Sequence, residues 1–326
     1  MPPHRPTPPV HNEAEALPGL FDFQINGFGG VDFQMDDLDE KDLLRATRSL
    51  RRHGVAGLFV AFITDTIDRL CRRLECMEKL RTKNADIGAI LLGYHLEGPW
   101  LSPAPGYCGA HPPAKMRAPS AAEFQLLQSA AGGGVRLITL APEWPGAIDF
   151  IALLAAAGVH VSLGHTQAGE ADIDAAISAG ARFCTHLGNG VPGLLPRHDN
   201  VVQRLLARDE LTACFIPDGV HLPPFTLQNF FRAKPPGRVL FTTDAMAGAG
   251  APPGCYTLGD VSVRIGTDGV ARAPGDSGLA GSTLTPDEGV RRVCRYLRLP
   301  QDEARRLWSI EPARMFGVEL GSNTAP

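Results

Sequence analysis

Four side chains of the types that bind metals or transfer protons each follow a short apolar run of the chain. They are Glu97, His165, His186 and Asp244. An ionised carboxylate such as Glu97 at the end of a buried strand carries a large desolvation cost unless it is paired or bound to a cation. In a (β/α)8 barrel the C-terminal ends of the strands open onto one mouth, where such side chains can meet. These residues therefore predict a catalytic site at the mouth of a barrel.

The residue types also indicate the chemistry of this site. Two imidazoles and one carboxylate, from His165, His186 and Glu97, form a set that zinc uses in hydrolases, with one position left open for water. Asp244 would be the general base that takes a proton from water and later gives it to a departing amine. Either histidine alone could equally be a satisfied core residue, and Asp244 alone could be an N-cap. Because all of them occur together, we favour the hydrolase site.

Further candidates lie in loops that follow other strands. His111, in the long loop after the third strand, could polarise a carbonyl group. Asn189, Gly190 and Arg197 follow the sixth strand and offer an amide, backbone donors and a guanidinium suited to a phosphate. His221 follows the seventh strand. Each of these could also be an ordinary solvated loop residue.

Strand-like and helical segments alternate along the chain, which would bring these residues together. Strands are predicted at 19–26, 55–63, 87–95, 135–140, 159–163, 182–185, 212–216 and 239–243. Helices are predicted near 38–53, 65–82, 121–131, 147–157, 168–179, 200–207, 224–232 and 287–296. Strict alternation implies an α/β fold with a parallel sheet and right-handed crossovers, and eight such units close a TIM barrel.

One segment interrupts the alternation. Residues 255–273 alternate apolar and polar side chains and contain the turn signal Gly266-Thr267-Asp268-Gly269, which predicts a β-hairpin inserted after the eighth strand. We expect one hydrolase domain over 18–317, a disordered proline-rich tail over 1–17 and a short tail over 318–326.

Composition limits the function classes. Hydrophobic residues make up 44% and charged residues 20% of the 326 residues, which fits a soluble globular protein. The net charge of -4 without a basic stripe argues against nucleic acid as a partner. No apolar run approaches the roughly 20 residues of a membrane span, so we expect no membrane partner. Seven cysteines without framework spacing, and no signal peptide, predict a cytoplasmic protein with reduced thiols.

Several short motifs carry a resemblance to a known family. They are Pro18–Gly27, His95–Pro99, Gly109–His111, Gly164–Thr166, Thr185–Leu187, Asp218–His221, Thr243–Ala245 and Leu279–Ser282. In this order the chain resembles the N-acetylglucosamine-6-phosphate deacetylases of the amidohydrolase superfamily. The motifs are jointly specific, although any one of them is weak.

The resemblance implies roles for the central residues. Glu97, His165 and His186 would hold one divalent metal ion, with zinc expected and iron or another divalent metal as alternatives. Asp244 would be the acid and base of the reaction, and His111 would polarise the acetamide carbonyl.

It also implies how the substrate is bound. Asn189, Gly190 and His221 would contact the sugar phosphate. Arg197 would reach the phosphate, in the family often from a neighbouring subunit, and a homodimer is the assembly that would allow this.

Two features set this chain apart within the resemblance. Members with a second metal carry His-x-His in the first strand, whereas this chain has Gln24 and Asn26, which are therefore candidate site residues and favour one tightly bound ion. The small β-sandwich usual in the family is expected to be largely missing.

The expected partner is a small amino-sugar substrate. The leading hypothesis is hydrolysis of N-acetylglucosamine 6-phosphate to glucosamine 6-phosphate and acetate. Alternatives are another N-acyl amino sugar, an N-acyl amino acid or a cyclic amide, and an inactive barrel that has become a sugar-binding protein.

Overall fold

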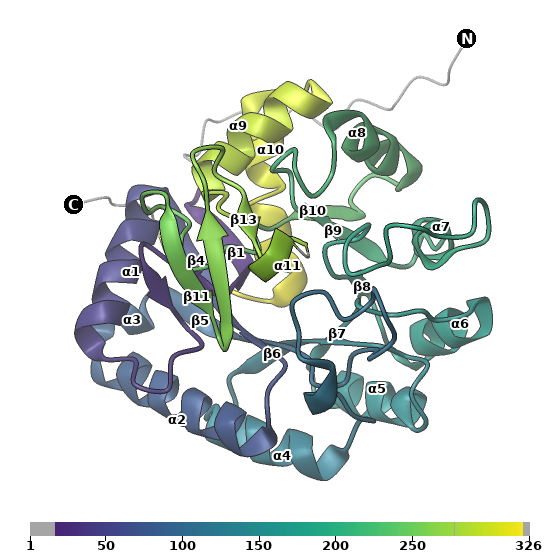
Figure 1. The fold of residues 1–326 in the computed structure, drawn as a ribbon, viewed down its shortest axis with the longest axis horizontal. Coiled ribbons are helices and arrows are strands. Elements are labelled where there is room, and N and C mark those ends of the chain that lie inside the picture. The colour runs from purple at the N-terminus through teal and green to yellow at the C-terminus, as the bar shows by residue number, and fades with distance from the viewer. Residues whose placement is uncertain (1–16, 277, 322–326) are drawn as a thin grey trace.

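Eight parallel strands form the large sheet of the protein, as the alternation predicted. The computed structural model describes residues 17–276 and 278–321, so the tail expected before residue 17 lies outside the described residues. The strands, in spatial order, are β1 (Leu20–Ile25), β4 (Val55–Ile63), β5 (Leu91–Glu97), β6 (Val135–Leu140), β7 (His160–Leu163), β8 (Phe183–Cys184), β9 (Thr212–Phe215) and β10 (Val239–Phe241). Their order follows the sequence, so each strand lies beside the next one and the sheet curves into a barrel (Figure 1).

Most of the helices surround the strands on the outside of the barrel (Figure 1). The helices are α1 (Glu40–Arg52), α2 (Ile67–Lys83), α3 (Ala85–Gly88), α4 (Ala121–Ala130), α5 (Ala147–Ala156), α6 (Glu170–Ala179), α7 (Val201–Leu206), α8 (Pro224–Ala233), α9 (Pro286–Leu297), α10 (Gln301–Arg306) and α11 (Ile310–Phe316), with 3-10 turns η1 (Pro113–Lys115) and η2 (Pro274–Asp276). The apolar run of β4 is buried along its whole length, as expected for a strand covered on both faces. No helix in the described ranges is long and apolar enough to span a bilayer.

The third barrel strand differs from its prediction in its start and its end. A strand was predicted over 87–95, but β5 begins at Leu91, because Asn84 caps the short helix α3 with its side chain and draws Ile87 into that helix. The strand continues to Glu97, which is therefore its last residue. Glu97 is thus held by strand pairing to β4 and β6.

A side chain closes the seam between the first and last barrel strands. Only an isolated bridge, between Ile25 and Ala245, pairs β1 with the segment after β10 among the described residues. Asp22 of β1 accepts hydrogen bonds from Thr242 Oγ1 (2.5 Å), Thr243 N (3.0 Å) and Thr243 Oγ1 (2.7 Å). Burial raises the pKa of Asp22 to about 6, although these hydrogen bonds oppose the shift. The Asp22 contacts fix the end of β10 beside β1.

The insertion after β10 is a three-stranded sheet and not the single hairpin predicted for 255–273. It consists of β11 (Gly254–Leu258), β12 (Val261–Ile265) and β13 (Ala271–Arg272), all antiparallel. The predicted turn joins β12 to β13, but a second turn at Gly259 and Asp260, where Gly259 has φ +60°, separates β11 from β12. The sequence does contain an indication of this second turn. Apolar Leu258 and Val261 are three residues apart, which interrupts the two-residue alternation of a strand. A further pair, β2 (Gly27–Phe28) and β3 (Val31–Asp32), follows β1.

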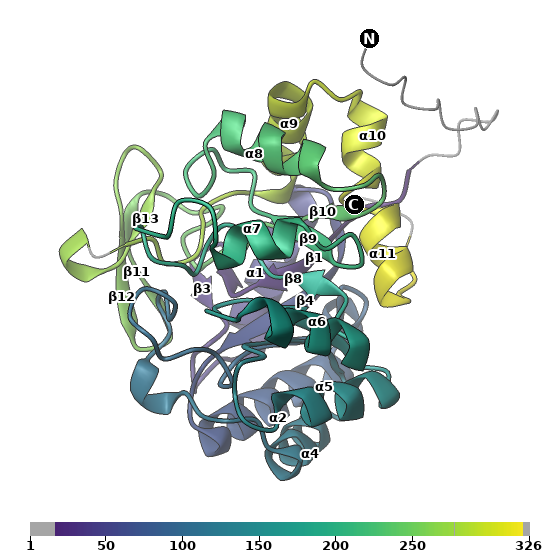
Figure 2. The ribbon, with the colours of Figure 1, turned by 90° about the vertical axis from the view of Figure 1, so that its right-hand side faces the viewer.

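The two ends of the barrel are covered by different elements. The three-stranded sheet lies at one end and α11 at the opposite end (Figure 2). Buried side chains of the sheet, among them Val263 and Ile265, pack with Ile63 at the end of β4. The sheet therefore covers part of the mouth where the strands end, and α11 covers the other end.

Helix α11, which the sequence did not predict, closes that other end with one aromatic ring. Phe316 is 4% exposed and lies against five rings with centroid separations of 4.9 to 6.1 Å. The rings are those of Phe21, Phe23, Phe59, His160 and Phe183. Val318 and Leu320, in the segment predicted as a short tail, pack against the same cluster.

Removal of this ring should destabilise the whole barrel. We expect Phe316→Ala to lower the free energy of unfolding by about 3 to 5 kcal/mol, because it removes buried surface and leaves a cavity. Phe225→Ala is the matched control, since Phe225 is 67% exposed on α8, and should change stability by less than about 0.5 kcal/mol. Urea unfolding followed by circular dichroism measures both, and equal losses in the two variants would contradict the role of Phe316.

Candidate active site

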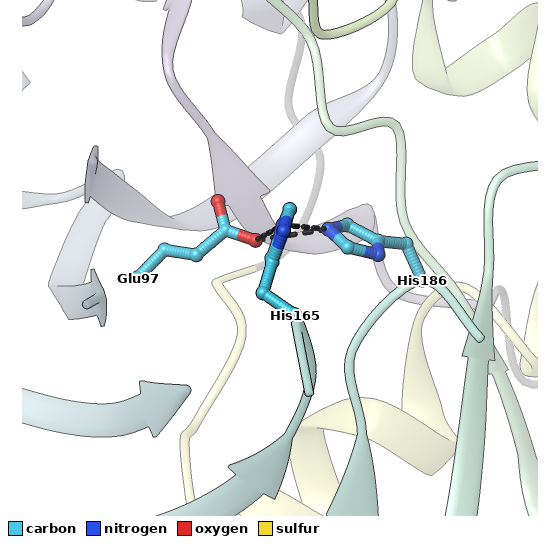
Figure 3. A group of neighbouring side chains, drawn as sticks. All are labelled: Glu97, His165 and His186. Carbon is cyan, nitrogen blue, oxygen red and sulfur yellow. Dashed lines mark hydrogen bonds and ion pairs between the residues drawn. The ribbon is translucent and has the colours of Figure 1, made fainter. Parts of the chain in front are cut away.

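Three of the predicted residues converge at the mouth of the barrel. Glu97 ends β5, while His165 and His186 each follow a strand by two residues, after β7 and β8. His186 Nε2 lies 2.9 Å and His165 Nε2 3.4 Å from Glu97 Oε1, and the two Nε2 atoms are 3.2 Å apart. Figure 3 shows the three side chains pointing toward one another from separate segments, with the ring of His165 in front.

This arrangement fits a divalent metal ion. Ligand atoms about 2.0–2.1 Å from a tetrahedral zinc ion lie about 3.3 Å from each other, which is close to the observed separations. His165 Nδ1 lies 2.7 Å from the carbonyl oxygen of Tyr107, which can only accept, so Nδ1 carries the proton and Nε2 presents its lone pair. One cation can bind all three ligand atoms when they face one another in this way.

Burial and hydrogen bonding set the charges of these groups. Burial opposes the ionisation of Glu97, but its close contacts with the imidazoles of His111, His165 and His186 outweigh burial and hold the pKa of Glu97 well below its usual value. Burial lowers the pKa of His165 to about 4. Glu97 is therefore an anion and His165 a neutral imidazole near neutral pH, which are the forms that bind a metal.

The backbone is strained where the candidate residues leave their strands. Among the described residues only four non-glycine residues have φ in the left-handed region, and three of them are His165 (+49°), His186 (+29°) and Asp244 (+50°). Such conformations cost on the order of 1–3 kcal/mol and persist where the surroundings hold them in place. Each of these turns ends a strand abruptly and places its side chain in the mouth.

Asp244 lies beside the three candidate ligands and is held by two amides. Gln24 Nε2 (3.1 Å) and Asn26 Nδ2 (2.7 Å) both donate to Asp244 Oδ1, so Oδ2 carries neither of these bonds. Burial, reinforced by the charge of Glu97, raises the pKa of Asp244 to about 6. The residues after Asp244 form a turn and not a helix, so the N-cap alternative does not apply. A carboxyl group in this environment can both accept and return a proton near neutral pH.

His111 faces the same site with a defined tautomer. The backbone N–H of Thr64 donates to His111 Nδ1 (3.2 Å), and the Thr64 hydroxyl lies 3.1 Å from the same atom. The proton of a neutral His111 is therefore on Nε2, which lies 3.5 Å from Glu97 Oε2. The sequence did not lead us to Thr64, although this polar residue directly follows the buried strand β4, in the same way that the other site residues follow their strands.

An ionic network anchors the loop that carries His111. Lys115, in η1, contacts Asp65 Oδ1 (2.6 Å) and Asp260 Oδ2 (3.0 Å). Asp65 also accepts from Arg69 (3.1 Å) and Arg73 (3.0 Å) of α2. The network joins the loop after β4, the loop after β5 and the β11–β12 turn, so it fixes both partners of the Thr64–His111 contact.

A cavity of about 490 Å³ opens in front of these groups. It is lined by Glu97, His111, His165, His186 and Asp244, and also by Asn26, Asn189, Gly190 and His221. Gln24 does not line it and acts through its contact with Asp244. A side chain at Gly190, where φ is +62°, would place its Cβ 2.7 Å from His165 Nδ1, so this position requires glycine.

The loop candidates occupy different places. Asn189 donates its side-chain amide to the carbonyl of His186 (3.1 Å). His221 Nδ1 lies 2.6 Å from Asp218 Oδ2, a partner that the sequence did not reveal although the two are three residues apart. Arg197, by contrast, is exposed and does not line the cavity. All the predicted site residues therefore line the cavity except Gln24, which contacts Asp244, and Arg197.

The barrel and the side chains at its mouth define a metal-dependent hydrolase. Two imidazoles and a carboxylate could hold the ion, an aspartate can transfer a proton, and a histidine can donate a hydrogen bond to a substrate oxygen.

Comparison with known proteins specifies the class further. A model of the amidohydrolase family matches residues 16–324. An N-acetylglucosamine-6-phosphate deacetylase of Vibrio furnissii is 34% identical over 310 residues, covering 94% of this chain and 76% of that protein. An N-acetylgalactosamine-6-phosphate deacetylase of Escherichia coli O157:H7 is also 34% identical, covering 97% and 83%. The structure of a mutant N-acetyl-D-glucosamine-6-phosphate deacetylase from Mycobacterium smegmatis, in complex with N-acetyl-D-glucosamine-6-phosphate, matches with a TM-score of 0.84 at 34% identity, covering 93% and 78%.

The chain belongs to the amidohydrolase family and, within it, to the N-acetylglucosamine-6-phosphate deacetylases. It is therefore a metal-dependent amide hydrolase, which agrees with the prediction from its sequence motifs. Membership implies a divalent metal ion, for which the cluster of Glu97, His165 and His186 is the candidate site.

Loss of one candidate ligand should abolish tight metal binding. We expect Glu97→Gln to weaken zinc affinity by more than about 100-fold, because a neutral amide replaces the only anionic ligand of the cluster. Elemental analysis after dialysis against a chelator, together with competition titration, measures the change. Glu170→Gln, at an exposed glutamate on α6, should retain the metal. Retention of metal by the Glu97 variant would show that the ion binds elsewhere.

Proposed function

We propose that the protein hydrolyses the acetamide of N-acetylglucosamine 6-phosphate and releases glucosamine 6-phosphate and acetate. The observation that supports this best is the placement of Asp244 and His111 in one cavity with the candidate metal cluster. The names of the similar deacetylases supply the substrate class.

The chain's own residues can perform the proton transfers of the reaction. A divalent cation held by Glu97, His165 and His186 would polarise the amide carbonyl and lower the pKa of water. Asp244 takes a proton from the attacking water and gives it to the nitrogen as the C–N bond breaks. His111 donates its Nε2 proton in a hydrogen bond to the carbonyl oxygen as negative charge develops there. The elements of water are thus divided between acetate and the free amine.

We propose zinc as the native ion, one per chain. Nitrogen and oxygen ligands in a three-residue set are typical of catalytic zinc, although iron shares this preference. Gln24 and Asn26 stand where a second ion would need basic ligands. Because their amide groups donate to Asp244, they hold that carboxylate without a second cation.

The phosphate requires positive charge that this cavity lacks. No lysine or arginine is among the described residues that line it, and His221 is paired with Asp218. We propose that Asn189, Gly190 and His221 contact the sugar phosphate and that Arg197 reaches it from a second copy of the chain in a homodimer. The exposure of Arg197 in the single chain supports this arrangement.

A second substrate has comparable support. The N-acetylgalactosamine-6-phosphate deacetylase is 34% identical to this chain, as is the N-acetylglucosamine-6-phosphate deacetylase of Vibrio furnissii. The two sugars differ at one hydroxyl, so the galacto epimer belongs in every assay. The proposed reaction suits the cytoplasm, since all seven cysteines are free thiols and the substrate is phosphorylated.

Replacement of Asp244 tests the proposed chemistry. We expect Asp244→Asn to lower kcat for N-acetylglucosamine 6-phosphate by about 10²- to 10⁴-fold, because an amide cannot accept the proton, while metal content stays the same. Asp174→Asn, at an exposed aspartate on α6, is the control and should retain full activity. Acetate release measured by a coupled assay reports the rates. Unchanged turnover in the Asp244 variant would refute the proposed base.

The phosphate contacts predict a substrate-specific defect. We expect Arg197→Ala to raise KM for the phosphorylated sugar by about tenfold or more and to leave turnover of unphosphorylated N-acetylglucosamine unchanged, because loss of a charge-assisted contact costs roughly 1.5–3 kcal/mol. The exposed Arg48 on α1 provides the control variant Arg48→Ala.

Mixing two defective variants tests the second copy directly. In a mixture of Arg197→Ala with Asp244→Asn, a subunit with an intact Asp244 would receive Arg197 from its neighbour and regain activity. Wild-type KM in the Arg197 variant, or no recovery on mixing despite subunit exchange, would contradict the proposal.

A further inference from the structure

A carboxylate outside the cavity holds the turn that carries His165. Glu143 follows β6 and does not line the cavity. It accepts a short hydrogen bond from the hydroxyl of Thr166 and another from the backbone N–H of Gln167 (2.9 Å). The Thr166 hydroxyl in turn accepts from Ala168 N (3.0 Å). The two residues after His165 are therefore both bound to one side chain.

The backbone of His165 needs such support. Its φ of +49° is unfavourable for a residue with a side chain, and its ring must lie within reach of Glu97 and His186. Its own carbonyl accepts from Ser102 N (2.9 Å), which fixes the turn on one side. Glu143 fixes the following residues on the other side.

Glu143 is itself firmly placed. The preceding Ala141 donates its N–H to the carbonyl of Trp100 (2.9 Å), and the following Trp144 donates its ring N–H to the carbonyl of Leu101 (2.9 Å). The loop after β5, which continues directly from Glu97, thus holds the loop that carries Glu143. Hydrogen bonds therefore connect the loops after β5, β6 and β7, which follow or carry the candidate ligands Glu97 and His165.

We propose that Glu143 is a positioning residue that fixes the His165 turn and thereby sets the affinity and geometry of metal binding. It lies outside the lining of the cavity and acts through Thr166 and Gln167. The proposal rests on the proposed metal site but not on the identity of the substrate. Groups that orient a metal ligand typically change affinity by about 10- to 100-fold when they are removed.

The experiment measures metal binding separately from catalysis. We expect Glu143→Ala to weaken zinc affinity by about 10- to 100-fold in a chelator competition titration and to alter the visible absorption spectrum of the cobalt-substituted protein. Glu143→Gln keeps one acceptor oxygen and should lose less. Glu170→Ala, at an exposed glutamate that pairs with Arg208, should leave both readouts unchanged.

A second variant tests the route through Thr166. Thr166→Val removes the donor with little change of shape and should reproduce much of the Glu143→Ala defect, whereas Thr166→Ser should restore affinity. The double variant Glu143→Ala/Thr166→Val should lose less than the product of the two single losses, because both remove the same bond. These variants decide the question even if Glu143→Ala fails to fold.

The outcomes separate this proposal from the proposed function. Zinc affinity within twofold of the wild type and an unchanged cobalt spectrum in Thr166→Val and Glu143→Ala would overturn the role of Glu143, even if thermal stability fell. If Glu97→Gln also kept its metal, the candidate metal site itself would be wrong. Weakened zinc binding in the Glu143 variant of a protein that does not hydrolyse the sugar phosphate would support the positioning role and refute only the substrate.

Discussion

The burial of the Glu97 carboxylate among imidazoles is the constraint on which the site depends. Glu97 is 2% exposed, and contacts with three imidazoles favour its ionised form. An anion so far from water is stable only with compensating positive charge, which neutral imidazoles supply poorly and a divalent cation supplies well. The left-handed turns at His165 and His186, and the loop contacts around them, place lone pairs where that charge belongs.

The barrel separates the residues that stabilise it from those that do chemistry. Phe316 closes one end with aromatic contacts, and Asp22 joins the first and last strands through buried hydrogen bonds. The strained turns lie at the opposite end, where the three-stranded sheet and the ionic network around Asp65 hold the loops. A rigid frame can support strain at the mouth because its own stability comes from contacts elsewhere.

Local patterns in the sequence predicted the barrel and most of its site. Glu97 and His165 could be found because a polar residue at the end of an apolar run is visible without any knowledge of distant contacts. The contacts that hold the structure around these residues in place could not be predicted in the same way. Asp22 meets Thr242 across 220 positions, and Glu143 reaches Thr166 between two loops, so neither pairing leaves a periodic signal. Helix α11 is only seven residues long, and the burial of its last side chain depends on where the barrel ends.

Gln24 and Asn26, at the end of the first strand, relate the expected single metal ion to the basicity of Asp244. A second cation beside Asp244 would stabilise its ionised form and lower its pKa, which would leave it a weaker proton acceptor. The amides of Gln24 and Asn26 hold the same oxygen by hydrogen bonds at 3.1 and 2.7 Å but carry no net charge. Before any metal ion binds, burial and the nearby charge of Glu97 raise the pKa of Asp244 to about 6, and the uncharged amides lower it less than a second cation would. Amides at these positions thus keep Asp244 in place and basic at the same time.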